Sequence, residues 1–185
     1  MDATVLLVMD VQRGIVERFA EDPGYLQRLA GAITAARGAG VPVVYVIIGF
    51  RPGHPEISAR NRTFSALAAA GGYVEGDPAA EIHPAVAPGP GDLVVTKRRV
   101  SAFTGSDLEV VLRAQEIDHL ILTGIATSGV VLSTLRQAAD LDYRLTVLSD
   151  CCHDNDPEVH RVLLEKVFPR QATVTTAELF LQSLD

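Results

Sequence analysis

Residues 118–134 join a short apolar run to the start of a helix, and this join restricts the fold more than any other stretch. The apolar run has the composition of a buried parallel strand, and Gly124 interrupts it. Thr127 or Ser128 can then cap a helix that we expect to run towards Ala139. A strand that turns tightly into a helix directs several backbone N–H groups at one point. We therefore expect a ligand site here, at the carboxyl edge of a sheet.

Other apolar runs alternate with helical patterns along the 185 residues. Together with the run after Asp118, the predicted strands are Thr4–Met9, Val43–Ile48, Asp92–Thr96, Arg144–Leu148 and Ala172–Thr175. Besides the helix after Gly124, the predicted helices are Tyr25–Arg37, Leu108–Glu116, Glu158–Phe168 and Ala177–Leu184. Strands that alternate with helices imply right-handed crossovers and a parallel sheet covered on both faces. We predict an α/β fold of three α-β-α layers, formed as one domain over residues 1–185. Its mostly parallel six-stranded sheet should have the Rossmann-like order 3-2-1-4-5-6.

Residues Gly49–Pro90 are the least regular part of the chain, with Pro and Gly throughout. Both loops and short helices are compatible with this composition. A connection of this length inside a compact domain is usually functional. We therefore expect a lid or a binding loop here.

The composition limits the compartment and the partners of the protein. Although 48% of the residues are hydrophobic, no run reaches the roughly 20 apolar residues that a membrane span needs. The first predicted strand begins at Thr4, which argues against a cleavable signal peptide. The net charge of −7 argues against nucleic acid as a partner. Cys151 and Cys152 are adjacent and cannot form an ordinary disulfide framework, as is typical of a reducing compartment. These features predict a cytoplasmic protein that binds neither membranes nor nucleic acid.

Three charged residues, Asp10, Lys97 and Asp150, lie at the ends of predicted strands. Each one alone is typical of a strand end that meets solvent. Asp10 and Lys97 have opposite charges and follow strands that can be neighbours, so the lysine can keep the carboxylate ionised or tune it for proton transfer. The five histidines show no metal-ligand spacing, and the turn at Gly124 lacks the G-x-G-x-x-G spacing of a dinucleotide site. We therefore predict no metal site and no cofactor.

Several stretches give the chain a resemblance to a known family. They are LLVMDVQ at residues 6–12, TKRRVSAF at 96–103, SDL at 106–108, and GIATSGVVLST at 124–134 followed by AAD at 138–140. In this order they resemble the isochorismatase-like hydrolase superfamily, which includes nicotinamidases, carbamoylsarcosine amidases and true isochorismatases. The resemblance covers nearly the whole chain, and it implies the sheet predicted above, a small-molecule substrate and a homo-oligomer. These motifs identify the superfamily and no particular substrate.

In the amidase branch, the resemblance implies an Asp–Lys–Cys triad with Asp10 as the base and Lys97 as its partner. The cysteine belongs six residues after Gly124, where this chain has Val130. Valine has no group that attacks a carbonyl, so the amidase mechanism does not carry over. The resemblance further implies a cis peptide at Ile125-Ala126, and a substrate pocket formed by Gln12, Phe103, Ile125, Ala126, Thr127 and Val130.

Three functions remain open. The first is hydrolysis without a cysteine, as in true isochorismatases, where the strand-one aspartate is the general acid; here Asp10 would act with assistance from Lys97. The turn after the fourth strand nevertheless lacks the Tyr and His of that branch. The second is a catalytically inactive protein that binds a small molecule. The third is a thiol enzyme that uses Cys151 or Cys152, which would need Asp10 within hydrogen-bond reach.

Overall fold

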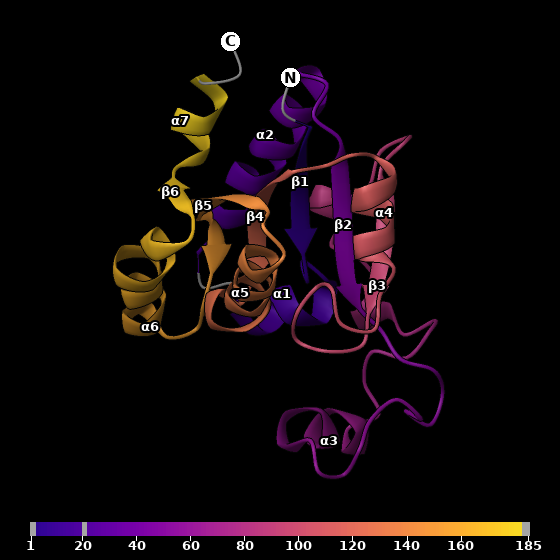
Figure 1. Ribbon diagram of the computed structural model, residues 1–185. Coiled ribbons are helices and arrows are strands. Elements are labelled where there is room, and N and C mark those ends of the chain that lie inside the picture. Colours follow the sequence, from indigo (N-terminus) through magenta and orange to yellow (C-terminus); the bar gives the residue numbers. More distant parts are fainter. Residues whose placement is uncertain (1–2, 20–21, 183–185) are drawn as a thin grey trace.

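The computed structural model describes residues 3–19 and 22–182 and contains the predicted α/β fold (Figure 1). Its six strands pair in parallel in the order β3-β2-β1-β4-β5-β6. They are β1 (Thr4–Met9), β2 (Val43–Ile48), β3 (Leu93–Lys97), β4 (His119–Ile125), β5 (Arg144–His153) and β6 (Thr173–Thr175). The predicted layers and strand order are confirmed.

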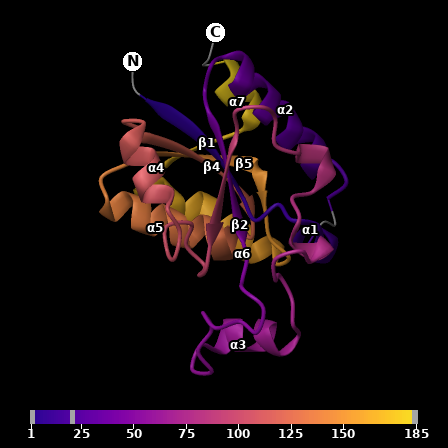
Figure 2. The same cartoon turned by 90° about the vertical axis from the view of Figure 1, so that its right-hand side faces the viewer.

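Helices cover both faces of the sheet (Figure 2). They are α1 (Arg13–Phe19), α2 (Tyr25–Gly38), α3 (Arg62–Ala69), α4 (Leu108–Ala114), α5 (Leu132–Asp140), α6 (Pro157–Val162) and α7 (Ala177–Gln182). A kinked segment at Thr127–Val131, in which Gly129 has a non-helical backbone, precedes α5, and a π-helical segment at Leu163–Val167 follows α6. The helix predicted over Glu158–Phe168 therefore begins one residue earlier and changes its geometry halfway. The expected end of α7 at Leu184 lies outside the described residues. Within the described residues, no helix is both long enough and apolar enough to span a bilayer.

β5 is longer than predicted, because it continues from Leu148 to His153. The polar pair Ser149-Asp150 interrupts the apolar run and therefore resembles a strand end in the sequence. The register between β4 and β5 shifts after Leu122, and Gly124 then pairs with Cys152. Both cysteines consequently lie within the sheet.

Alternating side chains explain why β1 is apolar along its whole length. Leu6 and Val8 pack in a core with residues of α2 and α7, whereas Leu7 and Met9 pack in a core with residues of α4 and α5. Successive side chains of a strand point to opposite faces, so a strand that is covered on both sides has no polar positions. Figure 2 shows α4 and α5 on one side of the sheet and α1 and α2 on the other.

The irregular segment Gly49–Pro90 contains α3, which projects from the body at the carboxyl ends of the strands (Figures 1 and 2). Two 3-10 turns, Pro78–Ala80 and Pro84–Val86, lead the chain back to β3. The projection is connected to the sheet by a small apolar cluster formed by Ile48, Phe50, Phe64 and Tyr73.

Gly124 lies near the end of β4, opposite the last residue of β1. It pairs with Met9, and its φ of +137° lies in a region that side-chain-bearing residues avoid. A Cβ atom at this position would overlap the carbonyl oxygen of Met9. The glycine therefore permits the turn that leads from β4 to the candidate site.

We expect Gly124→Ala to lower the free energy of unfolding by about 3 kcal/mol or more, because it adds both backbone strain and a steric overlap. Urea unfolding followed by circular dichroism measures this change. Gly31→Ala is the matched control, because Gly31 lies in α2 with no atom within 4 Å of the added Cβ. That control should stabilise the protein by up to about 1 kcal/mol. Equal effects of the two substitutions would contradict this account of Gly124.

Candidate functional site

Asp10 and Lys97 form a buried ion pair at the carboxyl edge of the sheet. Asp10 follows β1 with a φ of +57°, and its backbone N–H donates to the carbonyl of Val46 on β2. Lys97 ends β3, and its Nζ lies 2.9 Å from Oδ2 of Asp10. Their side chains are only 9% and 3% exposed, respectively. We expected β1 and β3 to be neighbours, but β2 lies between them. The side chains of Asp10 and Lys97 meet across the end of β2.

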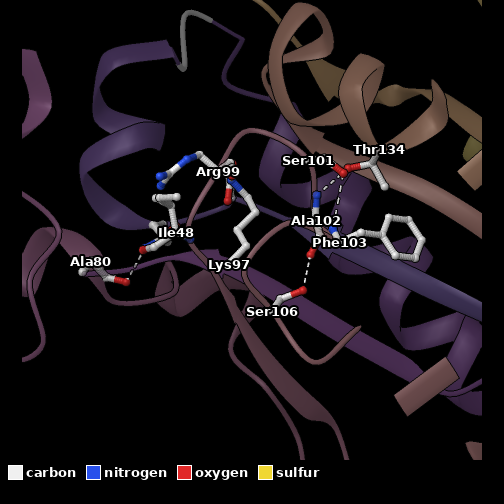
Figure 3. Close-up of polar contacts among 11 residues, drawn as sticks. Ile48, Ala80, Lys97, Arg99, Ser101, Ala102, Phe103, Ser106 and Thr134 are labelled. Carbon is white, nitrogen blue, oxygen red and sulfur yellow. Dashed lines mark hydrogen bonds and ion pairs between the residues drawn. The ribbon is translucent and has the colours of Figure 1, made fainter. Parts of the chain in front are cut away.

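The polar atoms of Asp10 and Lys97 differ in their hydrogen bonding. Nζ of Lys97 also donates to the carbonyl oxygen of Arg99 at 3.0 Å (Figure 3). Oδ1 of Asp10 is buried and has no hydrogen-bond partner among the residues that the structure describes. Burial raises the pKa of Asp10, and the nearby charge and hydrogen bond of Lys97 oppose that rise. A buried carboxyl group with one unpaired oxygen is suited to proton transfer.

A cavity of about 190 Å³ opens onto this pair. Its floor is formed by Asp10, Lys97 and the turn that follows β4. α1 and α3 supply most of the remaining wall, through Ile15, Arg18, Phe19, Phe64 and Leu67. The projecting segment therefore covers the carboxyl edge of the sheet, where a lid or binding loop was expected.

Three of the predicted pocket residues, Ile125, Ala126 and Val130, line this cavity with Asp10 and Lys97. The peptide bond between Ile125 and Ala126 is cis, as the resemblance implied. Gln12, Phe103 and Thr127 do not line it. The structure thus brings the ion pair and the β4 turn together, whereas the other three predicted residues lie outside the cavity lining.

Gln12 holds two loops together through its amide group. Its Nε2 donates to the carbonyl oxygens of Ile48, at 2.9 Å, and Ala80, at 2.7 Å. Its Oε1 accepts from the N–H of Ile48 at 2.9 Å. The side chain is fully buried, so its hydrogen bonds serve the end of β2 and the turn at Pro78–Ala80. Gln12 positions the site without facing the cavity.

Phe103 lies in a loop that is anchored to α5. The N–H of Ala102 donates to Oγ1 of Thr134 at 3.0 Å, and Oγ of Ser106 donates to the carbonyl of Ala102 (Figure 3). The ring of Phe103 packs against Tyr143 with 6.0 Å between ring centroids. The contacts of Ala102 therefore hold the loop after Lys97 in place.

The turn after β4 is held by residues that the sequence did not single out. Oγ1 of Thr127 and Nδ1 of His160 are 2.7 Å apart, and the N–H of Ser128 donates to Oδ2 of Asp154 at 2.7 Å. The predicted cap was wrong: Ala126 is the N-cap residue, and no side chain caps this end. Asp154 escaped notice because it follows the unpredicted extension of β5.

The two cysteines do not reach the cavity. Cys151 and Cys152 are buried in the two different cores, on opposite faces of the sheet. Burial raises the pKa of the Cys151 thiol to about 12 and that of Cys152 well above its ordinary value. Neither thiol is therefore suited to act as the nucleophile.

A second, larger cavity of about 640 Å³ lies beside the first, and the two share Ile48 and Tyr73. It contains neither Asp10 nor Lys97, so we assign the chemistry to the smaller cavity. Among residues 3–19 and 22–182, no three His, Cys, Asp or Glu side chains are grouped so that they could hold a metal ion.

The chain matches the family model for the isochorismatase domain over residues 4–179. It is 32% identical to a ureidoacrylate amidohydrolase of Pseudomonas syringae pv. syringae, over 96% of this chain and 78% of that protein. It is 33% identical to an uncharacterized isochorismatase family protein of Escherichia coli O157:H7, over 98% of this chain and 96% of the other. An isochorismatase family protein from Burkholderia thailandensis has a similar structure, with a TM-score of 0.85 and 30% identity over 98% of this chain and 95% of that one. The chain therefore belongs to the isochorismatase family of hydrolases.

We expect both thiols to resist alkylation in the folded protein at pH 7, because they are buried and protonated. Mass spectrometry after a short exposure to iodoacetamide should find neither Cys151 nor Cys152 modified. Both should react once the chain is unfolded in urea, which serves as the control. Rapid modification of one thiol in the folded protein, suppressed in Asp10→Asn, would instead support the thiol enzyme.

Proposed function

We propose that this protein hydrolyses a small metabolite without a cysteine nucleophile. In this mechanism Asp10 exchanges the proton and Lys97 stabilises its ionised form. The observation that carries the proposal is the buried carboxyl group of Asp10, a residue that lines the cavity, with its raised pKa and with an Oδ1 that has no hydrogen-bond partner among the described residues. No other carboxyl group lines that cavity among the described residues.

Because position 130 is a valine, the proposed mechanism has no protein nucleophile there. The resemblance to the amidase branch puts the nucleophilic cysteine at this position, and the side chain here is an isopropyl group that lines the cavity. Covalent catalysis through that position is impossible, since valine has no nucleophilic atom. In the proposed reaction, water therefore supplies the attacking oxygen.

Asp10 can serve such a reaction in two directions. As a general acid it would protonate a carbon of a vinyl ether, and water would capture the resulting oxocarbenium ion. As a general base it would take a proton from water that attacks an amide or carbamoyl carbonyl, and it would return that proton to the leaving nitrogen as the C–N bond breaks. The first reaction starts from the protonated carboxyl group and the second from the carboxylate, and in both the ammonium of Lys97 stabilises the carboxylate form. Relatives named as a ureidoacrylate amidohydrolase and an N-carbamoylsarcosine amidase make carbamoyl compounds suitable test substrates.

A catalytically inactive binding protein is the second candidate. The observation that favours it is the combination of Val130 in the cavity wall with two buried, protonated cysteines. Such a protein would bind the ligands that its relatives hydrolyse, and Val130→Cys would give it an amidase activity. A homo-oligomeric assembly and a cytoplasmic location stay predictions of either candidate.

We expect Asp10→Asn to reduce turnover by about 10²- to 10⁴-fold, because it keeps the shape of the side chain and removes proton transfer. The assay compares isochorismate, ureidoacrylate, nicotinamide and N-carbamoylsarcosine as substrates. Asp150→Asn is the matched control, since Asp150 lies outside the cavity and accepts a hydrogen bond from the N–H of Ala177, a role that asparagine can fill.

Two outcomes would overturn the proposed hydrolysis. Turnover that survives in Asp10→Asn would remove Asp10 from the chemistry. Binding of a panel compound without turnover in the wild type, with binding unchanged in Asp10→Asn, would establish the binding protein instead.

A pH profile tests the partnership of the buried pair. Because Lys97 lowers the pKa of Asp10, we expect Lys97→Met to raise that pKa and to move the Asp10 limb of the kcat/KM profile to higher pH. Lys97→Arg keeps the charge and should leave the limb near its original position. The stabilisation due to Asp10 is fully present below its ordinary pKa of 3.8 and is lost as pH rises through the raised folded value. The free energy of unfolding should therefore fall towards neutral pH more in Lys97→Met than in Lys97→Arg. Superimposable pH profiles for the two variants would contradict this partnership.

A further inference from the structure

Arg18 presents a fixed guanidinium group to the cavity that contains Asp10. It lies on α1 and lines this cavity. Its Nη2 donates to the hydroxyl of Tyr73 at 2.6 Å, its Nε donates to the carbonyl of Gly14 at 3.1 Å, and its Cζ lies 5.7 Å from the centre of the Tyr73 ring. We propose that Arg18 binds a carboxylate group of the substrate. This inference rests on the proposed function in one respect, that the cavity is the substrate site.

The charges around the cavity favour an anionic ligand. Its charged lining residues are Asp10, Lys97 and Arg18, and the first two neutralise each other as an ion pair. Arg18 forms no ion pair with any acidic side chain in residues 3–19 and 22–182. Among the described residues that line the cavity, Arg18 therefore contributes one positive charge without an acidic partner, although the whole chain has a net charge of −7. One excess positive charge suits a ligand with one negative charge.

The geometry of Arg18 suits a carboxylate in particular. A guanidinium is a planar fork that can donate two parallel hydrogen bonds to the two oxygens of one carboxylate. Nη1 of Arg18 makes no hydrogen bond to any described residue, while its other nitrogens secure the group to Gly14 and Tyr73. The side chain is exposed, so an entering ligand can reach this free edge.

Tyr73 is built to hold the guanidinium in place. It is only 4% exposed, and burial raises the pKa of its hydroxyl, which stays neutral and accepts the hydrogen bond from Arg18. Its ring offers the face over which the cation lies, a contact that restricts the guanidinium further. Tyr73 is therefore a positioning residue for Arg18.

The remaining wall limits the rest of the ligand. Apart from the three charged side chains and Tyr73, every lining side chain is apolar; these residues are Ile15, Phe19, Ile48, Phe64, Leu67, Val100, Ile125, Ala126 and Val130, together with Gly129. The cavity has a volume of about 190 Å³. The site thus selects a small monocarboxylate with a short apolar middle, whose carboxylate meets Arg18 and whose hydrolysable group meets Asp10.

Equilibrium binding of two matched probes tests this assignment without any need for turnover. N-carbamoylglycine carries a carboxylate, and N-carbamoylglycinamide replaces it with a neutral amide of similar shape. By isothermal titration calorimetry at pH 7 and low salt, the wild type should bind the carboxylate at least about tenfold more tightly than the amide. Arg18→Gln should abolish this preference, Arg18→Lys should retain part of it, and Tyr73→Phe should reduce it.

Arg13→Gln is the matched control, since Arg13 lies on the same helix, pairs with Glu81 and lines neither cavity. It should keep the full preference, and circular dichroism should show that every variant is folded. The inference is overturned if the wild type binds both probes equally, if Arg18→Gln keeps the preference, or if neither probe binds at 50 mM. Binding is measured directly, so loss of the preference in Arg18→Gln supports carboxylate binding by Arg18 even if no variant shows turnover. Turnover by a wild type that lacks the preference would refute carboxylate binding by Arg18 and leave the proposed hydrolysis intact.

Discussion

The buried ion pair of Asp10 and Lys97 sets the conditions for the structure around it. Moving two charges out of water costs several kcal/mol for each ion, and their attraction offsets this only with good geometry and further hydrogen bonds. Here the pair is 2.9 Å apart, and the ammonium also donates to the carbonyl of Arg99. That carbonyl belongs to the loop after β3, so the course of this loop is part of the electrostatic arrangement. The contact between Ala102 and Thr134 holds the same loop against α5.

Two other loops at this edge are also held by a buried polar side chain that binds the backbone of a distant segment. Gln12 joins the end of β2 to the turn at Pro78–Ala80, and Asp154 holds the turn after β4 through the N–H of Ser128. A buried amide or carboxylate is costly unless its partners are in place, so each contact favours one arrangement of its loop. The floor of the cavity is thus prepared before a ligand enters. α3, by contrast, meets the cavity through the apolar side chains of Phe64 and Leu67.

The sequence predicted the sheet because mostly apolar runs alternate with helical patterns along the chain. It also predicted that Asp10 and Lys97 would meet, although it expected their strands to be neighbours and β2 lies between them. It missed Arg18 and Tyr73, because an arginine on an amphipathic helix and a tyrosine in a long loop look like ordinary surface and core residues. It assigned Gln12 to the pocket, although the amide is used by backbone groups that only the folded chain brings near. Local sequence patterns predict the helices and strands. Which side chains face the cavity is decided by contacts between residues 36 to 68 positions apart in the chain.

Val130 changes the task of Asp10 in the proposed mechanism without changing its position. With a thiol at position 130, the carboxylate would have a proton donor within the protein. With valine there, Oδ1 has no hydrogen-bond partner among the described residues, so in the proposed mechanism Asp10 exchanges its proton with water or with the ligand. The isopropyl group also keeps the wall beside Asp10 apolar, which favours the neutral carboxyl group. Elsewhere in the same wall, the guanidinium of Arg18 favours a negatively charged group of the ligand. A ligand with one anionic end and one reactive polar end is therefore oriented by the site, because only one direction pairs each end with a suitable partner.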